Sequence, residues 1–202
     1  LTATFVAVPL ALRDAGLPSE QHWEVYLPAL LFSMAAIIPF IIIAEKRHKL
    51  KPVFLGAIST LALTEFGLLA LHDGVLEMSV LLLLFFTGFN LLEATLPSLI
   101  AKMAPPDAKG TAMGIYSSSQ FLGAFTGGAM GGWLRGWVGF KGVFAFAMLA
   151  ALAWLLAAWT MKNPRYLSSY LLNVGALDEA AAHRLARQLA QGGGYALGQL
   201  DI

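Results

Sequence analysis

The sequence alternates between long apolar runs and short polar breaks. Five runs approach the roughly 20 residues that a helix needs to cross the hydrocarbon core of a bilayer. They cover 23–44, 53–71, 78–101, 112–132 and 142–161. A further apolar run, 1–12, is too short to cross alone, and we expect it to be the outer half of a span whose beginning is missing. The pattern predicts an all-α membrane protein.

Composition supports the same class. The chain is 58% hydrophobic and 12% charged, with a mean hydropathy of +0.70, whereas an average soluble domain is about 25% charged. So many apolar residues cannot all be hidden in one soluble core, and we expect the lipid bilayer to surround the chain. The net charge of +1 argues against a nucleic-acid partner, because phosphate-binding surfaces carry a clear basic excess.

The sequence lacks the familiar motifs of enzymes. It has no nucleotide-binding glycine loop with Lys and Ser or Thr, no H-E-x-x-H and no G-x-S-x-G. The chain has no cysteine, and its histidines are scattered without the spacing of metal ligands; they are His22, His48, His72 and His183. We therefore expect no catalytic residues, no metal and no cofactor.

Positive charge is distributed unevenly between alternate breaks. One side collects eight basic residues, which are Lys46, Arg47, Lys49, Lys51, Lys102, Lys109, Lys162 and Arg165. The other side collects three, which are Arg13, Arg135 and Lys141. Because cytoplasmic loops retain Lys and Arg, the first side is predicted to be cytoplasmic, together with the C-terminus.

Two acids, Glu65 and Glu93, are predicted to lie well inside the spans. An acid in a span is costly unless protein or water surrounds it, so it is a candidate proton or substrate site. Glu93 shares a helix face with Asn90, and desolvation would let its carboxyl take up and release a proton. The alternative is a purely structural hydrogen bond. For Glu65, nearer the outer end of its span, we favour that structural role, with the side chain reaching toward water.

Polar and small residues mark the fifth span. Tyr116 and Gln120 lie four residues apart and are candidates for a wet cavity, although such side chains more often bond a neighbouring helix. Glycines at four-residue spacing predict close helix packing in two rows, which are Gly123, Gly127 and Gly131, and then Gly128 and Gly132. The charged run Lys46, Arg47, Lys49 and Lys51 is predicted to anchor the topology, with binding of acidic lipid or a conformational latch as alternatives.

The composition changes after Pro164. Residues 166–174 alternate enough for a strand, Asp178 can cap a helix that ends at 192–194, and 195–202 suggests a second strand. At about 40 residues this tail is too short to bury a core of its own.

Particular segments resemble a known family. GFNLLEATLPSLIAKMAPPDAKGTAMGIYSSSQFLGAFTGGAMGGW is similar to the tenth and eleventh helices of major facilitator superfamily transporters, specifically the YajR-like group of bacterial drug/proton antiporters. TFVAVPLALRDAGLP and IIIAEKRHKLKPVFLG resemble that group's seventh helix and the loop between helices eight and nine. The resemblance extends to about Arg165.

The resemblance implies twelve helices in two halves, of which residues 1–162 are the C-terminal six-helix half with its first helix truncated. The missing N-terminal half would then be a partner. Residues 163–202 resemble the beginning of a cytoplasmic α+β ferredoxin-like module that is incomplete here. Because helices seven and ten line the central cavity in this family, the resemblance favours Glu93 and Asn90 over Glu65.

Two functions remain open at this stage. The first is a proton-coupled secondary transporter that exports small amphipathic molecules by alternating access, driven by a proton gradient across the bacterial inner membrane. The alternative is a membrane-anchored binding or sensing protein whose soluble tail holds a ligand. Transport measurements on the full-length chain distinguish them.

Overall fold

The structure of the chain is a computed structural model, and it describes residues 1–46, 49–161 and 184. The chain divides into two units, Leu1–Lys162 and Asn163–Ile202, and everything below concerns the first. Within the described residues all regular secondary structure is helical. The strands and the ferredoxin-like module predicted for the tail lie outside the described residues.

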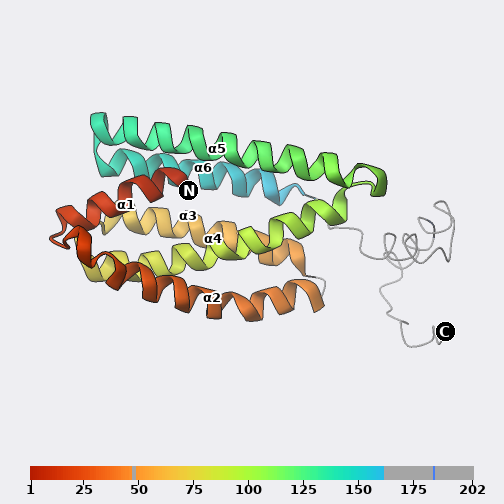
Figure 1. Ribbon diagram of the computed structural model, residues 1–202, viewed down its shortest axis with the longest axis horizontal. Helices are drawn as coiled ribbons and strands as arrows, with labels where there is room; N and C mark the ends of the chain where they lie inside the picture. The colour runs from red at the N-terminus through yellow and green to blue at the C-terminus, as the bar shows by residue number, and fades with distance from the viewer. Residues whose placement is uncertain (47–48, 162–183, 185–202) are drawn as a thin grey trace. The chain divides into compact units, whose positions relative to one another are not determined.

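Six α-helices follow one another through the described part of the first unit and run side by side, reversing direction at each turn (Figure 1). Their bounds are α1 Thr2–Asp14, α2 Trp23–Lys46, α3 Leu50–Ala70, α4 Val75–Met103, α5 Lys109–Val138 and α6 Phe140–Trp159. Two short 3₁₀ turns, Ser19–Gln21 and Pro106–Ala108, lie before α2 and α5. Each expected apolar run therefore forms a helix, within a few residues of the predicted bounds at most ends. The short first run gives the shortest helix, which begins part-way along the bundle (Figure 1).

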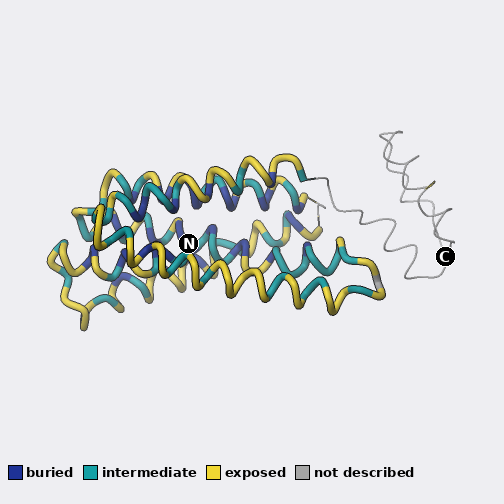
Figure 2. Tube along the Cα trace, turned by 90° about the horizontal axis from the view of Figure 1, so that it is seen from above, coloured by how far each residue is buried: buried dark blue, intermediate teal, exposed yellow. Residues whose placement is uncertain are grey.

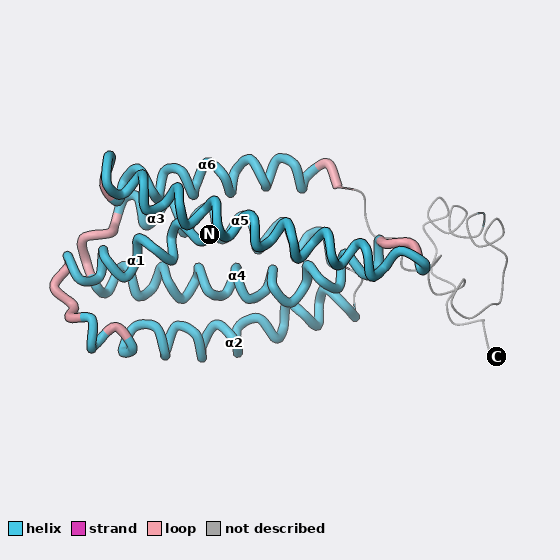
Figure 3. The backbone as a smooth tube through the Cα atoms, turned by 45° about the horizontal axis from the view of Figure 1, so that its top comes forward, coloured by secondary structure: helices cyan, strands magenta, loops and turns pink. Residues whose placement is uncertain are grey.

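The break expected between the apolar runs 112–132 and 142–161 is much shorter than predicted. Residues 133–138 continue α5, and the chain breaks at Gly139, so that α6 begins at the next residue (Figure 3). Gly139 has φ 77° and ψ −165°, a conformation that residues with a side chain rarely adopt. Residues 133–138 contain no proline, and a helix tolerates their one glycine, Gly136, so they form the last turns of the helix instead of a loop.

The centre of the bundle is formed by α3, α4 and α6. α3 packs against α4 and α6, and α4 also packs against α2. Phe85, Leu61 and Phe144, one from each of α4, α3 and α6, are fully buried among these helices. α1 and α5 form a second contact, although they are far apart in the sequence. Figure 2 shows the resulting pattern, in which buried positions recur along the central helices, whereas α5 has Gly131 as its one buried residue among the described positions.

Length and composition qualify four of the described helices to cross a membrane. They are Ser19–Lys46, Leu50–Ala70, Val75–Met103 and Phe140–Trp159, where the first includes the preceding 3₁₀ turn. α1 is too short for this criterion. α5 is long but less apolar, because it carries Ser117, Ser118, Ser119 and Gln120 as well as many glycines. The expectation of an all-α membrane half-bundle holds, with four clear spans among its six helices.

The glycines of the two predicted rows have different surroundings. A Cβ on Gly131 would lie 2.7 Å from Ala3 Cα, and one on Gly127 would collide with the Thr2 hydroxyl, so α5 meets α1 at these two positions. The other three glycines of the rows, Gly123, Gly128 and Gly132, have open space in the Cβ position. The two rows therefore do not form one continuous packing surface within the described residues.

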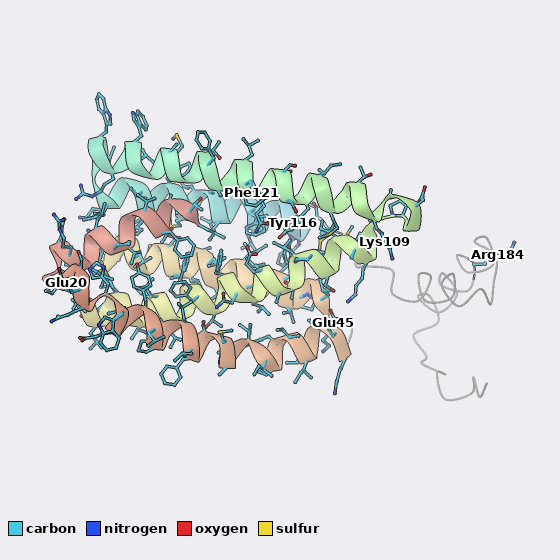
Figure 4. The ribbon with its side chains drawn as sticks, viewed as in Figure 1. Glu20, Glu45, Lys109, Tyr116, Phe121 and Arg184 are labelled. Carbon is cyan, nitrogen blue, oxygen red and sulfur yellow. The ribbon has the colours of Figure 1, made fainter. Side chains whose placement is uncertain are left out.

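Ion pairs tie the helices at both ends of the bundle. Lys102 Nζ lies 2.6 Å from Glu45 Oε2, which joins α4 to α2. At the opposite end Arg135 NH2 lies 3.3 Å from Asp14 Oδ2, and its guanidinium lies 3.9 Å from the centre of the Phe140 ring. In Figure 4, Glu45 and Lys109 label the first of these ends and Glu20 the other. The eight basic residues predicted for one side thus include Lys102 and Lys109 at the same end.

Candidate functional site

The most direct polar contact between predicted site residues joins α4 to α5. Gln120 Nε2 donates a hydrogen bond of 2.9 Å to Glu93 Oε1. Both residues are exposed within the described half-bundle, so the carboxylate and the amide are accessible from its surface. An exposed acid between two apolar helices is a place where a proton or a polar substrate group can be bound.

Tyr116 lies one helical turn before Gln120 on α5. Its hydroxyl has no hydrogen-bond partner among the described residues, although the oxygen itself is buried from solvent. A buried hydroxyl without a partner is costly, and it gains a hydrogen bond when a ligand supplies an acceptor. Tyr116 and Gln120 therefore remain candidates on the same side of α5, with Glu93 opposite them.

Asn90 is directed to a different neighbour. Its Nδ2 donates to Ser33 Oγ at 2.9 Å, which links α4 to α2, and Ser33 in turn donates to the Leu30 carbonyl at 2.7 Å. The helical spacing predicts one shared face for Asn90 and Glu93, but the two side chains bond different neighbours, α2 and α5. Positions three apart on a helix differ by about 60° in rotation as well as in rise, so each can meet a different helix.

Glu65 does not reach water. Its side chain is fully buried, and its Oε1 accepts a hydrogen bond of 2.5 Å from the Thr4 hydroxyl of α1. Its other carboxyl oxygen has no partner among the described residues. The prediction that Glu65 extends toward the outer surface is therefore wrong, because α1 covers it. The structural role expected for this acid agrees with its enclosure.

The charged run at the junction of α2 and α3 contains three described lysines. Lys46 ends α2, Lys49 immediately precedes α3, and Lys51 Nζ donates to the Trp159 carbonyl at the end of α6 over 3.0 Å. Arg47, predicted as part of this cluster, lies outside the described residues. Lys51 satisfies one of the carbonyls left open at the end of α6, which is a favourable place for a cation.

Sequence reasoning missed Glu45 and Ser33. Glu45 accepts hydrogen bonds from Lys102 and, at 3.1 Å, from Ser98 of α4. A single acid at the head of a basic run is a signal that could have indicated an ion pair. Ser33 offered no such signal, since a lone serine in an apolar helix usually bonds its own backbone. Among residues 1–46, 49–161 and 184, no group of His, Cys, Asp or Glu has the geometry of a metal site.

The sequence of the chain matches the model of the Major Facilitator Superfamily over residues 1–187. The chain belongs to the major facilitator superfamily. This confirms the resemblance found in the helix-ten and helix-eleven segments, and it places the chain among transporters rather than enzymes. The six helices correspond to the all-helical character expected of half of such a protein.

Several bacterial proteins are similar to the chain. The chain is 45% identical, over 87% of its length, to the inner membrane transport protein YajR of Escherichia coli, and covers 39% of that protein. It is 31% identical to an uncharacterized transporter of Buchnera aphidicola, over 63% of the chain and 33% of the relative. It is 28% identical to the multidrug resistance protein MdtH of Aeromonas hydrophila, over 72% of the chain and 34% of the relative. The chain thus spans about two fifths or less of the length of these superfamily members.

Proposed function

We propose that this chain is the C-terminal six-helix half of a proton-coupled secondary transporter that exports small amphipathic molecules. The two halves alternate access by rocking against one another, with the proton gradient as the driving force and no other cofactor. In this proposal the N-terminal half of the transporter packs against exposed helix faces of this half.

The observation that carries the proposal is the contact between Glu93 and Gln120. It sets an ionisable group on an accessible face between α4 and α5. A carboxyl there can be hydrated and charged when the cavity is open, and neutral when the cavity closes around it. Gln120 can keep a hydrogen bond to either form, since its amide both donates and accepts. Glu93 is therefore assigned as the residue that binds the proton or the substrate.

The remaining candidates give the site its substrate preference. The unpartnered hydroxyl of Tyr116 supplies one further polar contact near the α5 side of the site. Large apolar side chains stand exposed on the same helix, including Phe121 and Phe125. Few polar groups within apolar walls suit amphipathic compounds of varied shape. One relative, MdtH, is a multidrug resistance protein, which supports export of such compounds.

The proposed location is the bacterial inner membrane, with several spans and a cytoplasmic C-terminus. The name of YajR supports the inner membrane. The asymmetry of Lys and Arg supports the orientation, which places the Glu45 and Lys102 end of the bundle in the cytoplasm.

The test replaces Glu93 with Gln in the full-length protein. Glu93→Gln keeps the size and most hydrogen bonds of the side chain but cannot ionise. We expect normal folding and membrane insertion, together with loss of proton-driven export of an amphipathic dye from inverted vesicles. Glu77→Gln is the matched control, because Glu77 is an exposed acid in the first turn of the same helix. It should leave export unchanged.

Wild-type export with unchanged pH dependence in Glu93→Gln would remove this residue from the coupling mechanism. Absence of any proton-driven export by the unchanged full-length protein would favour the alternative function, a membrane-anchored protein that binds or senses a ligand through its tail.

A further inference from the structure

An open groove runs along the bundle between α2 and α3, with α4 as its floor. Its volume is about 330 Å³, and its lining residues are Phe40, Ile43, Lys49, Pro52, Val53, Gly56, Ala57, Thr60, Thr87, Gly88 and Leu91. This volume is at the lower end of the roughly 300–1,000 Å³ of small-molecule sites. The groove lies on the α2 side of α4, whereas Glu93 bonds α5, so it does not belong to the site described above.

The walls of the groove are mainly apolar, so they favour an apolar ligand. The two hydroxyls in the lining are already used by their own helices, because Thr60 donates to the Gly56 carbonyl at 3.0 Å and Thr87 to the Leu83 carbonyl at 2.8 Å. These residues therefore present mainly methyl groups. The remaining walls are aliphatic and aromatic side chains and glycine backbone.

One end of the groove carries a positive charge. Lys49 is exposed, lines the groove and forms no ion pair with any other described residue. Lys51, two residues on, is already bonded to the Trp159 carbonyl. The first turn of α3 begins directly after Lys49 and has no side-chain cap, so the positive end of its dipole adds to the potential there.

The length of the groove matches one leaflet. Lys49 and Thr60 mark its extent along α3, and at a rise of 1.5 Å per residue they lie about 16 Å apart. Half of a hydrocarbon core of about 30 Å is about 15 Å. A chain that begins at the level of Lys49 thus ends near the middle of the bilayer at Thr60.

We propose that this groove binds an anionic phospholipid, with one acyl chain along α3 and the phosphate at Lys49. Three features favour this occupant over others: apolar walls with satisfied hydroxyls, a single available lysine at one end, and the length of one leaflet. The end with Lys49 is also the end predicted to face the cytoplasm, where anionic lipids attract clustered basic residues. The proposal rests on membrane insertion and is independent of the transported substrate.

Substitution of a glycine in the lining can block the groove. A Cβ on Gly56 would meet no atom within 4 Å, so a larger side chain there fills the groove without displacing protein. Gly88, in the floor, is different, because its Cβ would lie 3.1 Å from the Ala57 carbonyl oxygen and from Leu61 Cγ. Gly56→Leu is therefore the variant that blocks the groove and preserves the helix contacts.

The experiment measures which lipid touches the groove. The full-length protein carrying Phe40→Trp is placed in vesicles of phosphatidylethanolamine and phosphatidylglycerol, with one or the other lipid brominated to quench fluorescence. The fluorescence of the added tryptophan is obtained by subtracting the fluorescence of the unchanged protein, which has tryptophans of its own. Ile42→Trp is the matched reporter, because Ile42 is exposed on α2 to a similar degree but does not line the groove.

We expect brominated phosphatidylglycerol to be preferred at Trp in position 40 by a factor on the order of five. No such preference is expected at position 42. Lys49→Gln and high salt should remove the preference, and Gly56→Leu should weaken quenching by both lipids at position 40. Lys46→Gln is the charge control, since Lys46 is exposed in the same basic run but outside the groove, and it should keep the preference.

Three results would overturn the proposal. Equal quenching by both lipids at position 40 would mean that the groove does not distinguish anionic lipid from phosphatidylethanolamine. Absence of quenching there would mean that protein, such as the other half of the transporter or a second copy, covers the groove. Equal effects of Lys46→Gln and Lys49→Gln would reduce the preference to a diffuse surface charge.

Discussion

The Thr4 hydroxyl donates a hydrogen bond of 2.5 Å to the Glu65 carboxyl, and both side chains are enclosed between α1 and α3. The two residues are 61 positions apart in the sequence. This contact connects the shortest helix of the bundle to one of its central helices, and it leaves the second oxygen of Glu65 without a partner among the described residues.

Thr4→Val is expected to destabilise the full-length protein. Valine keeps the shape of threonine but leaves both oxygens of the buried carboxyl unsatisfied, which costs about 1–3 kcal/mol. Thermal unfolding in detergent measures the loss. Thr126→Val is the control, because its hydroxyl bonds the backbone of its own helix at an exposed position. Equal midpoints for the two variants would show that the Thr4 bond contributes nothing to stability.

Gly131→Leu is expected to separate α1 from α5. Its side chain would enter the space held by the Ala3 backbone, and overpacking of this kind costs about 1–3 kcal/mol. The yield and melting temperature of the folded full-length protein should both fall. Gly132→Leu, the neighbouring position with open space, should retain both. An unaltered melting temperature for Gly131→Leu would contradict the close helix contact.

Gly139→Ala is expected to loosen the junction between α5 and α6. The backbone of Gly139 adopts a conformation essentially confined to glycine, and a Cβ there costs on the order of 1–3 kcal/mol. Gly136→Ala, in the last turns of α5, provides the comparison because its Cβ position is open and its φ is helical. If Gly139→Ala melted no earlier than Gly136→Ala, the junction would have to adopt another backbone conformation.

Thiol labelling checks the orientation of the bundle. A cysteine at Asp107, between α4 and α5, should react with a membrane-impermeant reagent only from the cytoplasmic side. A cysteine at Asp73, whose side chain is 93% exposed between α3 and α4, should react only from the outside. Labelling of the Asp107 position from the outside would reverse the proposed topology.

Much of the fold can be predicted from the sequence, because helix length and hydropathy are local properties. The apolar runs predict every helix of the half-bundle, and Pro18 and Pro105 each directly precede a 3₁₀ turn that leads into the next helix. The missed feature is the length of α5, since the aromatic residues after Gly132 resemble a membrane-interface turn although nothing in them stops a helix.

The residues of the candidate site can also be chosen from the sequence, but their partners cannot. Spacing along α4 places Asn90 and Glu93 one turn apart, yet the first bonds Ser33 of α2 and the second Gln120 of α5. The rotation of each helix against its neighbours decides these contacts. This rotation depends on packing between helices, and the bonded residues are 57 and 27 positions apart in the sequence.

The sequence by itself therefore determined the class of the protein, the number of its described helices and its family. Apolar length, the distribution of charge and the segments that resemble the family are all local properties of the chain. Tertiary structure decided which glycines meet another helix, which acid is enclosed and where a groove is open. Gly131 and Gly132 are identical in the sequence and adjacent, but the first contacts Ala3 and the second faces open space. Successive helical positions point about 100° apart, so one packs against α1 while the other does not.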